Sequence, residues 1–101
     1  MSRLEQIQKL LEREPDDVFL NFGLAMEYTK AARHADAVAQ FERIHRIDPS
    51  YIPAYFQKGN TLIAAGDEAG ARSALQQGIA VARQVGDQHA VGEMTDLLER
   101  M

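Results

Sequence analysis

The chain has 101 residues, 46% hydrophobic and 26% charged, which are values typical of one small globular domain. It contains no cysteine, which excludes a disulfide framework, thiolate metal ligands and thiol catalysis. A net charge of -4 argues against nucleic acid as a partner, and no apolar run reaches the roughly 20 residues that a membrane span requires. The N-terminus is acidic and amphipathic, unlike a signal peptide, so we expect a cytoplasmic protein.

The first predicted helix spans residues 3–14. Its apolar residues recur at helical spacing, with polar residues opposite: Leu4, Ile7, Leu10 and Leu11. Pro15 disfavours helical geometry in the residue before it, so the helix is expected to end near Glu14.

Residues 17–50 contain the next two predicted helices. The helix at 17–30 is apolar on more than one face, as is typical of a helix packed between two neighbours in a stack. Asp16 or Asp17 can cap its start. The helix at 35–47 has a single apolar stripe: Ala37, Val38, Phe41, Ile44 and Ile47.

A sequence period, equal to the separation of Pro15 and Pro49, relates residues 51–85 to residues 17–50. At this spacing large residues mostly stay large and small ones stay small. Residues 3–14 correspond to the second half of such a repeat. Gly66 with Asp67 predicts a left-handed helix end followed by a cap, whereas Ala32 and Arg33 at the same place in the first repeat leave that turn unsettled. Gly59 and Gly78 fall inside helices, which indicates close helix crossings.

The period changes after the fifth helix. Arg83 stands where the next proline is expected, so this helix should continue to about Val85 and end at Gly86. Residues 88–101 form a sixth amphipathic segment with apolar positions at helical spacing: Ala90, Val91, Met94, Leu97, Leu98 and Met101. We expect this segment to be a capping helix over the uncovered side of the fifth.

This pattern resembles the tetratricopeptide repeat, in which a helix pair recurs with a period of about 34 residues. The positions that carry the resemblance are Leu24, Ala25, Tyr28, Ala37, Phe41 and Pro49. The resemblance, which extends to small stand-alone bacterial proteins of this type, implies an all-α, right-handed α-α superhelix of about six antiparallel helices. Its expected parts are a half-repeat at 3–14, repeats at 17–50 and 51–85, and the cap at 88–101. It also implies a protein- or peptide-binding module with no catalysis and no cofactor.

Ligands of such repeats bind in the concave groove made by the first helix of each pair. Projection of these helices gives the candidate groove residues Phe19, Phe22, Met26, Thr29, Phe56, Asn60, Ile63, Ala90, Met94 and Leu97. Phe22 and Phe56 stand one period apart, so their rings are predicted to lie side by side on one wall. Asn60 resembles an asparagine with which some family members clamp a terminal carboxylate. However, Phe22 and Phe56 stand where lysine would be needed, which disfavours such a clamp.

Two interpretations of the groove residues stay open. Phe22, Met26 and Phe56 are either ligand contacts or core, and Asn60 either binds a ligand backbone or simply faces solvent. The three histidines, of which His45 is expected on a mostly exposed helix face, lack metal-ligand spacing with a carboxylate, so we expect no metal.

Two functions also stay open. One is an adaptor that holds a partner helix or extended segment in the apolar groove. The other is a self-associating scaffold unit, a homo-oligomer, because a short stack leaves apolar surface at its ends or groove.

Overall fold

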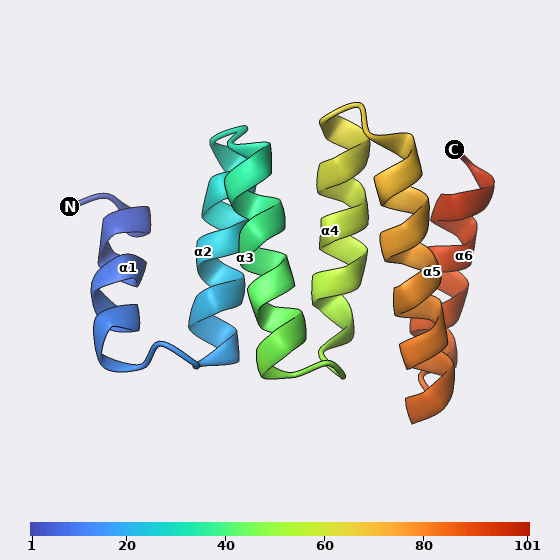
Figure 1. Ribbon diagram of the computed structural model, residues 1–101, viewed down its shortest axis with the longest axis horizontal. Helices are drawn as coiled ribbons and strands as arrows, with labels where there is room; N and C mark the ends of the chain where they lie inside the picture. Colours follow the sequence, from blue (N-terminus) through green and yellow to red (C-terminus); the bar gives the residue numbers. More distant parts are fainter.

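The computed structural model covers residues 1–101 and consists of six α-helices joined by short turns, with no strand. The helices are α1 (Arg3–Arg13), α2 (Val18–Lys30), α3 (His34–Ile47), α4 (Ile52–Ala64), α5 (Glu68–Val85) and α6 (Gln88–Glu99). They stand side by side in chain order, each antiparallel to the one before (Figure 1). The expected all-α stack of six antiparallel helices is confirmed.

Side-chain caps determine where most of the helices begin. Ser2 and Glu5 cap α1 reciprocally, since the Glu5 N–H donates to Ser2 Oγ at 3.1 Å and the Ser2 N–H donates to Glu5 Oε1 at 3.2 Å. The carboxylates of Asp17, Asp67 and Asp87 accept a backbone N–H in the first turns of α2, α5 and α6. The caps expected at Asp17 and Asp67 are therefore confirmed.

The turns after α2 and α4 share one backbone shape although their sequences differ. Gly66 lies in the left-handed region with φ 83°, and Ala32, its equivalent in the preceding repeat, has φ 57°. In both turns the next N–H donates to the carbonyl five residues earlier, at 2.9 Å after α2 and 2.8 Å after α4. The repeat thus keeps this turn even where alanine must adopt a conformation that favours glycine.

The core consists of two clusters of buried side chains. The first lies among α2, α3 and the start of α4: Ala25, Ala37, Phe41, Ile44 and Ala54. The second lies among α4, α5 and α6: Tyr55, Leu75, Ile79, Ala82, Ala90 and Met94. The closest backbone packing is between helices that are consecutive in the chain. The helix α4 is therefore the one element that contributes buried residues to both clusters.

Two glycines allow the close crossings in the second cluster. A Cβ added to Gly59 would lie 2.7 Å from a Leu75 methyl carbon, so α4 and α5 pack there without room for a side chain. A Cβ added to Gly78 would lie 2.6 Å from both Tyr55 Cβ and Met94 Sδ. The close packing expected at both glycines is confirmed.

The last two helices depart from the regular repeat. With Arg83 in place of a proline, α5 has 18 residues and its final turn projects past the ends of its neighbours (Figure 1). The αL residue Gly86, with φ 80°, ends it. The helix α6 then folds back along α5 and buries Ala90 and Met94 against it.

Candidate functional site

The residues predicted to line one groove are divided between two separate hollows. The first, here called the α2 hollow, has a volume of about 490 Å³ and is lined by Arg3, Phe19, Phe22, Gly23, Met26, Glu27 and Lys30. The second, the α4–α6 hollow, has a volume of about 300 Å³ and is lined by Ile52, Pro53, Phe56, Gln57, Asp87, His89, Ala90, Glu93 and Met94. The two hollows share equivalent residues of the repeat, since Phe19, Phe22 and Gly23 of α2 correspond to Pro53, Phe56 and Gln57 of α4. The α2 hollow extends toward α1, whereas the other lies between α4 and α6.

The α2 hollow is apolar at its centre and charged at one end. Phe19 is 79% exposed, which is unusual for a large apolar side chain. Glu27 forms ion pairs with both Arg3, at 3.5 Å, and Lys30, at 3.3 Å. The single carboxylate of Glu27 therefore pairs with two exposed cationic side chains, so this end of the hollow has a net positive charge.

Phe22 and Phe56 do not form the expected pair. The Phe22 ring packs instead on Phe41, with centroids 6.0 Å apart, and edge-on to Tyr51, at 5.5 Å. Phe56 packs against the second core cluster. Each ring is half-buried over a different cluster, because Tyr51 at the start of α4 takes the place beside Phe22.

Met94, which the helical projection placed in the groove, lies beneath the α4–α6 hollow rather than on its exposed wall. Its side chain is only 1% exposed, because it fills the space that Gly78 leaves beside Tyr55. It forms the floor of the α4–α6 hollow and belongs to the core. Ala90 is likewise buried at this floor.

The remaining candidates lie outside both hollows. Thr29 donates its hydroxyl to the Ala25 carbonyl oxygen at 3.0 Å, and its Oγ1 lies 3.4 Å from Thr61 Oγ1 on α4. It therefore helps to join two first helices. Asn60 and Ile63 on α4 are partly buried, and Leu97 on α6 packs against the second cluster.

The α4–α6 hollow combines an apolar wall with an acidic rim. Ile52 and Phe56 are partly exposed and supply the apolar surface of α4. Asp87 and Glu93 supply the rim from the α6 side, and no lysine or arginine lines the hollow. His89 Nε2 lies 3.5 Å from Glu93 Oε1 at the exposed edge. This arrangement suits an apolar group that carries a positive charge nearby.

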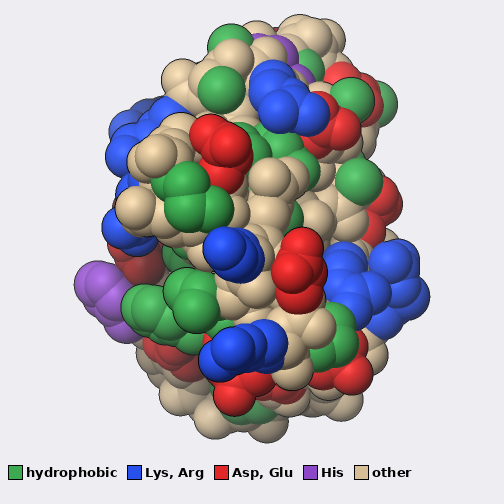
Figure 2. Space-filling model, turned by 90° about the vertical axis from the view of Figure 1, so that its left-hand side faces the viewer, with side chains coloured by type: hydrophobic (Ala, Val, Ile, Leu, Met, Phe, Trp, Pro, Cys, Tyr) green, Lys and Arg blue, Asp and Glu red, His purple; other side chains and the backbone are tan.

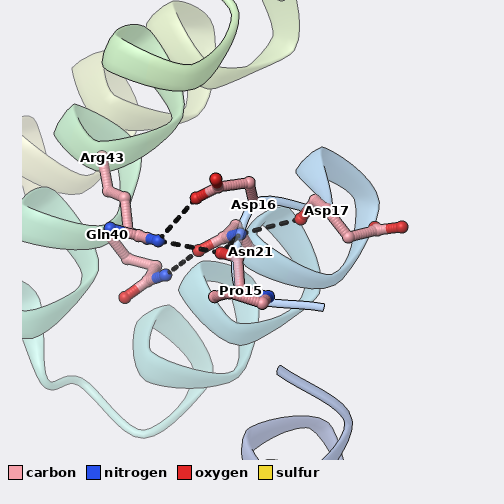
Figure 3. A network of polar contacts seen from close by, with 6 residues as sticks. All are labelled: Pro15, Asp16, Asp17, Asn21, Gln40 and Arg43. Atoms are coloured by element: carbon pink, nitrogen blue, oxygen red, sulfur yellow. Dashed lines mark hydrogen bonds and ion pairs between the residues drawn. The ribbon is translucent and has the colours of Figure 1, made fainter. Parts of the chain in front are cut away.

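A third hollow, between α1 and α3, is lined in part by a polar network that the sequence did not reveal. Figure 3 shows this network. Asn21 is buried, and its amide donates to the carbonyl oxygens of Pro15, at 3.0 Å, and Asp17, at 2.8 Å. Gln40 donates in turn to the Asn21 side-chain oxygen. The polar groups of Asn21 are thus satisfied within the protein, which indicates a structural role.

Arg43 completes this network from α3. Its guanidinium donates to the Pro15 carbonyl oxygen and to the Asp16 carboxylate, both at 2.9 Å (Figure 3). One repeat later, the Tyr55 hydroxyl donates to the carbonyl oxygen of Pro49 at 2.8 Å. Asn21 and Tyr55 therefore make the same contact to equivalent prolines, although their side chains differ.

His45 is half-buried between α3 and α4, in contrast to the expected exposed position. Its ring stacks on Tyr55 with centroids 4.0 Å apart, and neither ring nitrogen has a hydrogen-bond partner. Burial, assisted by the nearby Lys58 charge, lowers the pKa of His45 to about 4. The imidazole is therefore neutral at pH 7 and acts as a packing group.

The structure contains neither a metal-ligating cluster nor a helix that is long and apolar enough to span a membrane. The structure contains no group of three or more His, Cys, Asp or Glu side chains placed to hold a metal ion. None of the helices combines the length and apolarity needed to cross a bilayer.

The chain is similar in sequence to known tetratricopeptide repeat proteins. The sequence model described as "Tetratricopeptide repeat" matches residues 28–91. The "TPR repeat-containing protein PA0015" of Pseudomonas aeruginosa is 37% identical over 98 residues, which cover 97% of this chain and 93% of the relative.

Solved structures give the same result. The solution structure of protein BPP2914 from Bordetella parapertussis superposes with a TM-score of 0.86 at 32% identity, covering 99% of this chain and 87% of that one. A tetratricopeptide repeat domain protein from Salinibacter ruber superposes with a TM-score of 0.79 at 31% identity, covering 85% and 87%.

Proposed function

Because the chain belongs to the tetratricopeptide repeat family, whose domains are in general protein-interaction modules, we propose that it is an adaptor that binds a partner segment in the α4–α6 hollow. The segment is an amphipathic helix or an extended peptide. The family is in general a non-enzymatic repeat domain, and we assign no reaction to this chain.

The observation that carries this proposal is the half-buried Phe56 beside an acidic rim. The ring rests on the core, which holds it in place, and leaves part of its surface open to the hollow. An apolar side chain of the partner would bury that open surface, and each Å² of apolar surface buried contributes about 25 cal/mol to the binding free energy. A lysine or arginine next to this side chain would face Asp87 and Glu93, which favours a basic partner segment over an acidic one.

The α2 hollow is less suited to the same partner. Its rim is basic, from Arg3 and Lys30, so a segment that complements the α4–α6 hollow would meet like charge there. The opposite charges of the two rims therefore favour different contacts for the two hollows.

The proposal is tested by capturing partners with the tagged chain and then measuring the affinity of each identified partner by calorimetry. Glu93→Lys reverses an exposed rim charge without disturbing the core, and we expect it to weaken binding several-fold, more at low salt. Phe56→Ser should weaken binding about tenfold or more, which corresponds to roughly 1.4 kcal/mol. Circular dichroism of each variant checks the fold.

Phe19→Ser is the matched control, since Phe19 is an exposed phenylalanine at the other hollow. It should leave the affinity unchanged. Wild-type affinity in both Glu93→Lys and Phe56→Ser, with loss in Phe19→Ser, would place the partner at the α2 hollow and refute the proposal.

A further inference from the structure

The charged residues at one end of the α2 hollow are not part of the repeat. The hollow has Arg3, Glu27 and Lys30 at this end. Their equivalents one period later are all uncharged: Ala37, Thr61 and Ala64. The next repeat therefore forms without charged groups at these positions, and the three charges distinguish the α2 hollow from the rest of the stack.

The two cations are far more exposed than the carboxylate that they share. The side chains of Arg3 and Lys30 are 69% and 71% exposed, whereas that of Glu27 is 15% exposed. Both cations approach the same oxygen, Glu27 Oε2, and Arg3 does so through Nε. The two terminal guanidinium nitrogens of Arg3 are thus free to bind a second carboxylate, in the bidentate geometry that arginine favours. A ligand at this end of the hollow meets two cations above a covered carboxylate.

The apolar part of the hollow forms one stripe along α2. Phe19, Phe22 and Met26 follow one another at intervals of three or four residues, and Lys30 continues the same face of the helix. From Phe19 to Lys30 the stripe is about 16 Å long, which matches three turns of a partner helix. Apolar surface lies toward the start of α2 and positive charge toward its end. Figure 2, which looks onto the α1 end, shows basic side chains at the upper left, above an apolar patch.

The positive charge of this hollow is a local feature. The chain as a whole has a net charge of -4, and the charged rim of the α4–α6 hollow is acidic. The third hollow has one acid and one base in its lining, Glu12 and Arg43, whose charges balance. Among these three hollows, only the α2 hollow has a net positive lining. An acidic group that approaches the protein therefore finds its electrostatic complement there.

We propose that the α2 hollow is a second docking site, which binds an acidic amphipathic segment of a partner protein. Apolar side chains of the segment cover Phe19 and Phe22, and an aspartate or glutamate further along the segment binds Arg3 and Lys30. The segment proposed for the α4–α6 hollow is basic, so the two hollows bind segments of opposite charge. This proposal stands on the residues of the α2 hollow and does not rest on the function proposed for the other.

Two model peptides of about 12 residues, capped at both ends, test this proposal. Both are amphipathic helices with leucines on one face. The other face carries glutamates in the first peptide and lysines in the second. Titration of the isotope-labelled full chain, followed by the NMR shifts of its backbone amides, shows where each peptide binds. We expect the glutamate peptide to shift the amides of α2 from Phe19 to Lys30 and the lysine peptide to leave them unchanged.

Neutral variants test the contribution of the two cations. Arg3→Gln combined with Lys30→Gln should weaken binding of the glutamate peptide about tenfold or more and make the remaining affinity less sensitive to salt. Arg72→Gln combined with Arg83→Gln is the matched control, because both arginines are exposed on α5 and the net charge changes equally. It should leave the affinity near its wild-type value. Phe19→Ser should also weaken binding, and circular dichroism verifies that each variant is folded.

The proposal is overturned if the glutamate peptide shifts no amide of α2 at about 1 mM, if the lysine peptide shifts them equally, or if the two double variants weaken binding to the same extent. Shifts in α2 that grow with protein concentration in the absence of peptide would assign the hollow to a second copy of the chain and would also overturn it. The lysine peptide and Phe56→Ser report on the α4–α6 hollow, so failure of this proposal is distinguishable from failure of the adaptor proposal.

Discussion

Replacing Ala32 with glycine should stabilise the protein. With φ 57°, Ala32 holds the left-handed conformation that costs an L-residue about 1–2 kcal/mol and costs glycine nothing comparable. Its side chain is exposed, so removing the methyl group loses little packing. Glycine also gives the unfolded chain more freedom, which subtracts about 0.4–1 kcal/mol.

The net gain is therefore about 0.5–1 kcal/mol, which for a domain of this size raises the melting temperature by about 3–6 °C. Gly66→Ala at the equivalent turn should do the reverse and lower the stability by about the same amount. Nothing lies within 4 Å of a Cβ added at Gly66, so its effect comes from the backbone alone.

Thermal and urea unfolding followed by circular dichroism measure both variants. Ala31→Gly is the matched control, because Ala31 precedes Ala32 at the end of α2 with φ -82° and gains nothing from glycine. It should lose about 0.5–1 kcal/mol. An Ala32→Gly variant that melts at or below the wild-type temperature would refute the assignment of strain to this turn.

Three further perturbations test the packing. Gly59→Leu should lower the free energy of unfolding by about 1–3 kcal/mol in a urea melt, since its Cβ already meets Leu75, and an upward shift of the midpoint would show an open crossing. Deleting residues 87–101 uncovers the second core cluster and should give a protein that aggregates or binds a hydrophobic dye, whereas a soluble and equally stable product would contradict a capping role. Stability should fall as the pH drops from about 6.5 to about 4, because His45 takes up a proton in the unfolded chain but not in the folded one. His45→Phe keeps a ring on Tyr55 and should lessen this acid sensitivity, and identical pH profiles for the two proteins would exclude His45 as its source.

The sequence predicts the helices well because their signals are local. Apolar spacing, Pro15, Pro49 and the aspartate caps act within one or two turns, and the repeat period then orders the helices in a stack. The turn at Ala32, which the sequence left unsettled, has the same shape as its equivalent at Gly66, because the hydrogen bonds that close both turns join backbone groups.

The site was harder to predict because a helical projection gives the direction in which a side chain points but not how deeply the side chain is buried. Met94 points toward the inner face as expected, yet a glycine on α5 leaves room for it to sink into the core. Phe22 is turned correctly, but Tyr51 comes from a connecting segment that no projection of α2 includes.

Asn21 shows the same limit for polar residues. Asn21 occupies the position that is equivalent to Tyr55 in the next repeat, and its small amide looks like a departure from the large aromatic residue there. Both side chains nevertheless donate a hydrogen bond to the carbonyl oxygen of the preceding proline. That equivalence depends on the three-dimensional path of the chain before each helix, and side-chain size alone does not show it.

The division of the core into two clusters that share only α4 has a consequence for how the molecule opens. One half can lose its packing while the other keeps its own, so amide hydrogens should exchange in separate groups rather than in one global event. The helix α1 has a single buried residue, Ile7, and should exchange first. A ligand on one half would then slow exchange mainly within that half, and α4 would report on both.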